Sequence, residues 1–364
     1  MLVNENSYVS SSRYAHRHII EIDYLRCFAI FAVIYIHTAS ATMRVEETAN
    51  LIPVIYLNSL AQFAVPLFIC ISGFVLYLSY KPSEGVISFY KKRYLRIIPP
   101  YLIFSTIYLI ANIFKAKISE GMWDIPTTLD IIYAYVFAES NPHMWFFLII
   151  IELYLLYPML ERIYRAILKM NMEWLFLLAT LLLQVLWNIF SVDLVIVLDG
   201  VAHPLTNKIF LCTIFYFVLG ICLSNHYNGV RHFLKSAWIY LLSLLTGLLC
   251  IFIPLMFSIM NVGDGIVGEV GFCTLAILVL FSIGIYLTDN SKFDQLVVIG
   301  AYSFGIYLIH PLIQGLFGYI IYPMIGIDPS MLIYYILVFI TTSLISILGV
   351  YIIQKLPYHR YIIG

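Results

Sequence analysis

The stretch Ile19–Ala41, IIEIDYLRCFAIFAVIYIHTASA, decides the fold class of this chain. Apart from a few ionisable side chains it is a continuous apolar run, and as a helix it is long enough to cross the hydrocarbon core of a bilayer. The composition agrees, because 62% of the 364 residues are hydrophobic and only 11% are charged, with a mean hydropathy of +0.94. The sequence therefore predicts an all-α fold, a polytopic bundle of membrane-spanning helices.

Similar runs follow along the rest of the chain, and we expect about ten spans of roughly 20 residues each. An even number would place both termini on one side of the membrane. The expected spans are Ile19–Ala41, Leu51–Tyr80, Ile97–Phe114, Met144–Pro158, Trp174–Phe190, Ile209–Leu223, Ala237–Ile259, Val270–Leu287, Leu296–Tyr322 and Met331–Gln354.

Lysine and arginine are unevenly divided between the two sides that these spans define. One side holds fifteen of them: Arg13, Arg17, Lys81, Lys91, Lys92, Arg93, Arg96, Arg162, Arg165, Lys169, Arg231, Lys235, Lys292, Lys355 and Arg360. The other side holds four: Arg44, Lys115, Lys117 and Lys208. Because loops rich in lysine and arginine stay in the cytoplasm, both termini are predicted to be cytoplasmic. The expected organisation is a cytoplasmic tail (1–18), a transmembrane domain (19–355) and a second cytoplasmic tail (356–364).

Several other features of the chain are expected to carry no function. Ala39-Ser40-Ala41 resembles a signal-peptide cleavage site, but the preceding run contains Arg26 and His37, so we expect it to be retained as a membrane helix. The six cysteines lie in apolar runs without metal-ligand spacing, which argues against a metal site. Gly263–Gly268 has GxGxxG spacing but follows no strand, so we expect a flexible turn. A net charge of zero and the lack of a basic face exclude a nucleic-acid partner.

Ionisable side chains inside a span are costly and usually face a polar cavity or the interior of the bundle. The first span holds Glu21, Asp23, Arg26 and His37. Arg26 and His37 are eleven residues apart, which places them within about 20° of one face and roughly 16 Å apart along a helix. Asp23 can pair with Arg26 one turn away. The alternative is that Asp23 and Arg26 are interfacial anchors and that His37 only packs.

Three further groups of polar residues lie at or inside the expected spans. Arg93 and Arg96 share a face at the cytoplasmic start of the third span, and paired guanidinium groups suit phosphate, although ordinary positive-inside residues would look the same. In the fourth span Trp145 is an interfacial aromatic, and Glu152 lies two turns deeper without a nearby cation, so we expect a histidine on another helix as its partner. His310, late in the ninth span, is expected to pack structurally.

Together these residues resemble the acyltransferase 3 family of integral membrane O-acyltransferases. The resemblance extends from about Ile20 to the C-terminus and is weakest in the middle helices. Some members append a soluble esterase-like domain to the membrane helices. The organisation expected here, a transmembrane domain with two short tails, is instead similar to that of stand-alone members, which act on exopolysaccharides or surface glycans. The matching motifs are Ile22–Arg26, Arg26 with His37, Ile71–Val75, Arg93 with Arg96, Trp145–Leu148 with Glu152 and Pro158, and Ser303–Pro311.

The resemblance implies transfer of an acyl group, expected to be acetyl, from cytoplasmic acyl-CoA to a hydroxyl of an extracytoplasmic carbohydrate at a bacterial cell membrane. It implies that Arg26, Arg93 and Arg96 hold the donor's phosphates and that His37 is a general base or a nucleophile. Glu152 would orient His37, and no metal would be needed. A glycan synthase is a possible partner. Asp23, Trp145 and His310 would bind substrate or support the site.

Two other classes of function fit the same residues. An exporter or flippase of a glycan would also carry buried ionisable groups, although we find no inverted repeat and no matched pair of broken helices. A sensor or scaffold would bind a small ligand in the same polar cavity without chemistry. Activity with acyl-CoA would separate the enzyme from both alternatives.

Overall fold

The computed structural model of this chain describes residues 18–40, 52–197, 208–258, 266–290, 293–328 and 330–364. Within these residues the chain is helical and has no strand, which confirms the predicted all-α class. The predictions that concern Arg13, Arg17, Arg44, Lys292 and the first half of Gly263–Gly268 lie outside the described residues.

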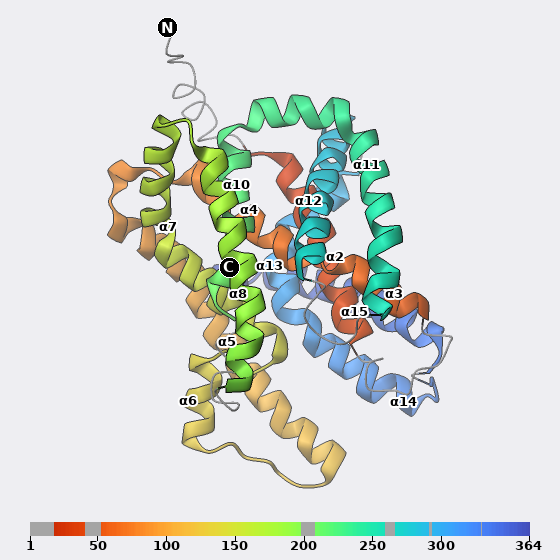
Figure 1. The fold of residues 1–364 in the computed structure, drawn as a ribbon. Helices are drawn as coiled ribbons and strands as arrows, with labels where there is room; N and C mark the ends of the chain where they lie inside the picture. Colours follow the sequence, from red (N-terminus) through yellow and green to blue (C-terminus); the bar gives the residue numbers. More distant parts are fainter. Residues whose placement is uncertain (1–17, 41–51, 198–207, 259–265, 291–292, 329) are drawn as a thin grey trace, which may run out of the picture.

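Nine helices in the described part of the chain are long and apolar enough to cross a membrane, and a tenth apolar helix, α10, is shorter. They correspond one to one with the expected spans (Figure 1). The elements are α2 (Ile20–Ala39), α3 and α4 (Ile52–Ala61, Ala64–Ser79), α5 (Val86–Glu120), α7 (Trp145–Lys169), α8 (Glu173–Val197), α10 (Ile214–Asn225), α11 (Tyr227–Ser258), α12 (Ile266–Asp289), α13 (Asp294–Gln314) and α15 (Leu332–Ile353).

Several helix ends differ from the expected ones, and prolines explain most of the differences. The third and fourth spans continue through Pro99, Pro100 and Pro158 instead of beginning or ending near them. Neighbouring helices in a membrane bundle can satisfy the backbone groups that proline leaves unpaired. The second span is instead broken between α3 and α4, and the ninth continues from α13 through the π-helical segment η6 (Gly315–Ile321) into α14 (Tyr322–Met324).

Helix α2, which carries Arg26 and His37, lies in the middle of the bundle and contacts α4, α12, α13 and α15 (Figure 1). A glycine permits its closest approach to α13, because a Cβ atom on Gly300 would lie 1.8 Å from the carbonyl oxygen of Asp23. Glu21 fixes the same end of α2 to α11, since its Oε1 accepts hydrogen bonds from Tyr227 (3.0 Å) and Arg231 (3.1 Å). These contacts fix the position of α2 relative to α11 and α13 near Arg26.

The C-terminal residues do not extend away from the bundle. Residues 359–363 form a short helix, α16 (His359–Ile363), which contacts α5, α13 and α15. Ile363 is only 5% exposed. The segment expected as a cytoplasmic tail thus forms part of the packed structure beside Arg96.

Candidate active site

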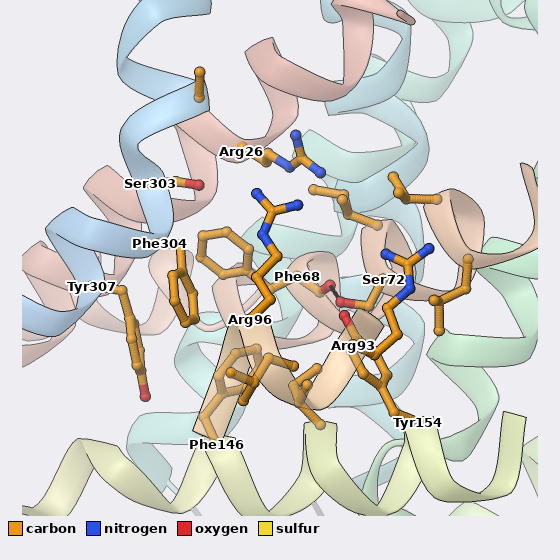
Figure 2. A pocket seen from close by; sticks show the side chains of 16 residues that line it. Arg26, Phe68, Ser72, Arg93, Arg96, Phe146, Tyr154, Ser303, Phe304 and Tyr307 are labelled. Carbon is orange, nitrogen blue, oxygen red and sulfur yellow. Dashed lines mark hydrogen bonds between the residues drawn. The ribbon is translucent and has the colours of Figure 1, made fainter. Parts of the chain in front are cut away.

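Three arginine side chains meet in one cavity, which we call the inner pocket. Arg26 comes from α2, and Arg93 and Arg96 lie one turn apart on α5. Figure 2 shows that all three guanidinium groups point into this pocket. Its volume is about 180 Å³. The rest of its lining is mostly apolar and includes Phe68, Ile71, Val75, Ile97, Phe146, Ile150, Tyr154, Phe304 and Tyr307. The structure therefore brings together the three cations that the sequence assigns to donor binding.

The inner pocket carries more positive than negative charge. Arg26 donates to Asp23 Oδ1 at 2.9 Å, the i, i+3 pair expected from the sequence, and Asp23 is 1% exposed. Arg93 donates to the Ser79 hydroxyl at 2.5 Å. Arg96 forms no ion pair with any residue that the structure describes, and both other arginines lie close enough to repel it. One carboxylate against three guanidinium groups favours a phosphate-bearing ligand.

A second cavity, the outer pocket, lies around His37 at the other end of α2. Its volume is about 250 Å³. Beside the His37 ring, its polar lining comes from separate elements: Gln62 at the break between α3 and α4, Gln184 and Asn188 on α8, Trp145 on α7 and Glu269 on α12. Amide, indole and carboxylate groups around a half-buried imidazole can bind a polar molecule by hydrogen bonds.

Three imidazole rings from three helices cluster at the outer pocket. The His37 ring centroid lies 5.2 Å from that of His310 and 6.0 Å from that of His143, and His143 and His310 are 5.5 Å apart. His143 is 1% exposed and His310 is completely buried. His310, expected to be a packing residue on its own, therefore supports the ring of His37 directly.

Hydrogen bonds fix the orientation of the two buried imidazoles. Nδ1 of His143 lies 2.8 Å from the amide oxygen of Asn141, and Nδ1 of His310 lies 3.2 Å from the carbonyl oxygen of Ile306. Since these oxygens only accept, each Nδ1 carries the hydrogen, and each Nε2 keeps a lone pair. Both Nε2 atoms are buried without a partner among the described residues. They can accept a hydrogen bond from a group placed beside His37.

Two aromatic side chains separate the inner and outer pockets. Phe146 and Tyr307 line both of them, and their ring centroids are 5.4 Å apart. The Tyr307 hydroxyl donates to the carbonyl oxygen of His143, which ties this partition to the histidine cluster. Phe68 packs against Phe146 at 6.2 Å from the inner side. A slender apolar chain lying beside these rings would connect the arginines to His37.

The structure does not bring Glu152 to His37. The Glu152 carboxylate accepts a hydrogen bond of 2.7 Å from the backbone N–H of Phe210. Phe210 begins the short helix η5 (Phe210–Cys212), and Cys212 lines the outer pocket. Glu152 thus anchors η5, which contributes Cys212 to the outer pocket, and the carboxylate of Glu269 lines that pocket itself.

Sequence reasoning missed His143, Gln62 and Glu269 as site residues. His143 lies two residues before Trp145, so the family motif around Trp145 was a usable signal. Glu269 gave no comparable signal, because polar residues near the ends of spans are common on any membrane helix. Gln62 lies inside the expected second span, so its amide was a signal that the motifs did not include. Among the described residues, no group of three or more histidine, cysteine, aspartate or glutamate side chains is arranged to hold a metal ion.

Comparison with known families identifies the family of the chain. The family model for the acyltransferase 3 type, described as an acyltransferase domain, matches residues 19–352. The chain belongs to the acyltransferase 3 family. With its series of apolar helices, it is a multi-pass membrane acyltransferase.

Relatives of this acyltransferase 3 protein have two kinds of name. A protein of Staphylococcus aureus (strain MSSA476) is named probable poly-beta-1,6-N-acetyl-D-glucosamine export protein, and it is 25% identical over 358 residues, 95% of each chain. The protein named acyltransferase MdmB, from Streptomyces mycarofaciens, is 26% identical over 163 residues, 41% of each chain. No solved structure matches the chain.

Proposed function

We propose that this acyltransferase moves an acyl group, acetyl in the simplest case, from cytoplasmic acyl-CoA to a hydroxyl of a carbohydrate on the outer side of the cell membrane. The arrangement of α2 carries the proposal. Arg26 faces a cationic pocket, and His37 faces a polar pocket roughly 16 Å further along the helix, with an aromatic partition between them. The lysine and arginine distribution supports a cytoplasmic position for the cationic pocket.

The inner pocket has the chemistry that a CoA thioester requires. The diphosphate of CoA is polyanionic, and Arg26, Arg93 and Arg96 supply planar forks of donors for it. The pantetheine arm is long and thin, and its methylene and methyl groups can pack against the aromatic wall of Phe146 and Tyr307. With the diphosphate at the arginines, the arm would carry the thioester along the partition to His37.

His37 is the group that would handle the proton. In one route, its ring takes the proton of the acceptor hydroxyl while the hydroxyl oxygen attacks the thioester carbonyl carbon. The carbon–sulfur bond then breaks, and the CoA sulfur leaves with the proton that His37 returns. In the other route, one His37 nitrogen attacks the carbonyl carbon, the carbon–sulfur bond breaks, and CoA leaves as the thiol with the proton of the other ring nitrogen. The acyl group then passes to the oxygen of the acceptor hydroxyl, whose proton returns to His37.

In either route His143 and His310 would position His37. Each presents an acceptor nitrogen beside it, and an N–H of His37 held by one of them leaves the other ring nitrogen of His37 free to react. This is the orienting role that Glu152 was expected to have.

The outer pocket suits a sugar. Gln62, Gln184 and Asn188 offer both donors and acceptors for hydroxyl groups, and the Trp145 indole offers an apolar face for the ring of a sugar. A polysaccharide acceptor is consistent with the name of the staphylococcal relative.

Binding and slow hydrolysis of acetyl-CoA by the purified protein in detergent test this proposal. The wild type is expected to bind and to hydrolyse the thioester, His37→Ala to bind without hydrolysis, and Arg93→Ala to bind at least about tenfold more weakly, as the loss of one charge-assisted contact implies. Lys169→Ala, which removes an exposed cation at the far end of α7, is the matched control and should behave as wild type. Failure of the wild type to bind any acyl-CoA would overturn the donor assignment.

Export of a glycan is the second candidate, because the staphylococcal relative is named an export protein. The break between α3 and α4, which puts Gln62 on the outer pocket, is the kind of interruption that transport sites use. Movement of a labelled oligosaccharide across proteoliposomes without acylation would favour export. Acylation that needs His37, without such movement, would favour the enzyme.

A further inference from the structure

A third cavity adjoins the inner pocket where the C-terminal segment covers the start of α5, and we call it the C-terminal cavity. Its volume is about 550 Å³. It shares Arg96, Ala301 and Phe304 with the inner pocket, so the two cavities meet at the Arg96 side chain. Its other walls come from α13, α15 and α16. No residue of α16 lines the inner or the outer pocket.

The C-terminal wall of this cavity is firmly packed. Ile363 is 5% exposed and, with Val350, lies over Gly305, where an added Cβ atom would come within 2.9 Å of Val350. Gly364 packs on the ring of Phe304, since a Cβ atom there would lie 2.5 Å from the ring. The end of α16 is therefore packed against α13 and α15.

The lining of the C-terminal cavity is cationic and aromatic. It includes Lys92, Arg96 and Arg360 but no aspartate or glutamate. Lys92 is already paired with Glu84, whereas neither Arg96 nor Arg360 forms an ion pair within the described part of the chain. Arg360 lies close enough to repel Arg96. Two uncompensated guanidinium groups beside one cavity are a site for an anion.

Two tyrosines beside these arginines favour a ligand that carries an aromatic base as well as an anionic group. Tyr302 on α13 and Tyr361 on α16 both line the cavity, and Tyr361 is half exposed. Aromatic side chains next to cations bind nucleotides, because the base stacks on the ring while the cations hold the phosphate. The cavity therefore has the features of a site for a phosphorylated nucleoside.

We propose that the C-terminal cavity holds the 3′-phosphoadenosine end of the donor, with Arg360 and Arg96 on the 3′-phosphate. This inference rests on the proposed function, since it takes acyl-CoA as the donor. If the thioester lies at His37 and the diphosphate at Arg26 and Arg93, the nucleoside must continue past the arginines. The C-terminal cavity adjoins them there, because it shares Arg96 with the inner pocket. Helix α16 is then a specificity element of the donor site.

The test compares acetyl-CoA with acetyl-dephospho-CoA, which lacks only the 3′-phosphate. Wild type is expected to bind acetyl-CoA about tenfold more tightly, as one charge-assisted contact implies. Arg360→Gln should lose most of this preference, retaining only what Arg96 supplies, and Arg360→Lys should keep more of it. Lys355→Gln is the matched control, because Lys355 lies on the same segment over the Tyr351 ring, outside the cavity, and should behave as wild type.

Three outcomes would overturn the inference and leave the donor assignment intact, and two of them come from the donor comparison. One is a wild type that binds both donors equally, and the other is an Arg360→Gln variant that folds and keeps the full preference. In nanodiscs, a dependence on Arg360 that appears only with anionic lipid would assign the arginine to a lipid headgroup and would also overturn it. A wild type that binds neither donor would instead contradict the proposed function itself.

Discussion

Replacing Gly300 by alanine tests whether the contact between α2 and α13 sets the position of Arg26. The new Cβ atom would lie 1.8 Å from the carbonyl oxygen of Asp23 and 2.6 Å from its carbonyl carbon. Both neighbours are backbone atoms, so no side-chain rotation can relieve the clash, and the two helices must move apart. Overpacking of this kind costs about 1–3 kcal/mol. Movement of α2 at this level would also displace the Asp23–Arg26 ion pair of 2.9 Å.

The expected result is a lower melting temperature in detergent together with a weaker affinity for acetyl-CoA, measured by calorimetry on protein that still elutes as a single species. Turnover of bound donor should change less, because His37 lies roughly 16 Å away along α2. Gly247→Ala is the matched control, since a Cβ atom there meets nothing within 4 Å. A Gly300→Ala protein as stable as wild type, with unchanged donor affinity, would refute this account of the helix contact.

Three other changes separate the parts of the site. His143→Ala should lower the rate of acetyl-CoA hydrolysis at least about tenfold while the donor affinity stays within twofold, because it removes the Nε2 that we propose accepts a hydrogen bond from His37. An equal rate would show that His143 only packs. Glu269→Gln should raise the KM for the carbohydrate and leave hydrolysis without acceptor unchanged, and an effect on hydrolysis alone would place Glu269 with the donor. Phe146→Leu should increase hydrolysis in the absence of acceptor, because the partition next to Tyr307 is thinner, and a decrease would argue against a partition.

The fold was largely predictable because the apolar runs are long and the solvent is lipid. The spans around Arg26 and His310 were placed correctly by hydropathy alone, and even the short span Ile209–Leu223 appears as α10. Helix ends were less predictable at Pro99, Pro100 and Pro158, since neighbouring helices compensate for the lost backbone bonds. The break between α3 and α4 was not predicted, although Pro66 lies four residues after Gln62 and has no N–H to donate to the Gln62 carbonyl.

The candidate site was predictable where its residues share one helix. The spacing of Arg26 and His37 on α2, and of Arg93 and Arg96 on α5, places each pair on one face from helix geometry alone. The partner of His37 was not predictable, because it depends on which helices pack together. A carboxylate was expected, but Glu152 binds the backbone of Phe210, and two histidines from distant segments surround His37 instead.

The central claim is that the acyl group enters at the arginines on one side of the membrane and leaves on a carbohydrate on the other. Sealed right-side-out vesicles loaded with radiolabelled acetyl-CoA, with an oligosaccharide outside, measure this directly. The account predicts labelled ester on the outer oligosaccharide with wild type and none with His37→Ala. Transport of the oligosaccharide without label, or acylation only when donor and acceptor share one compartment, would contradict it.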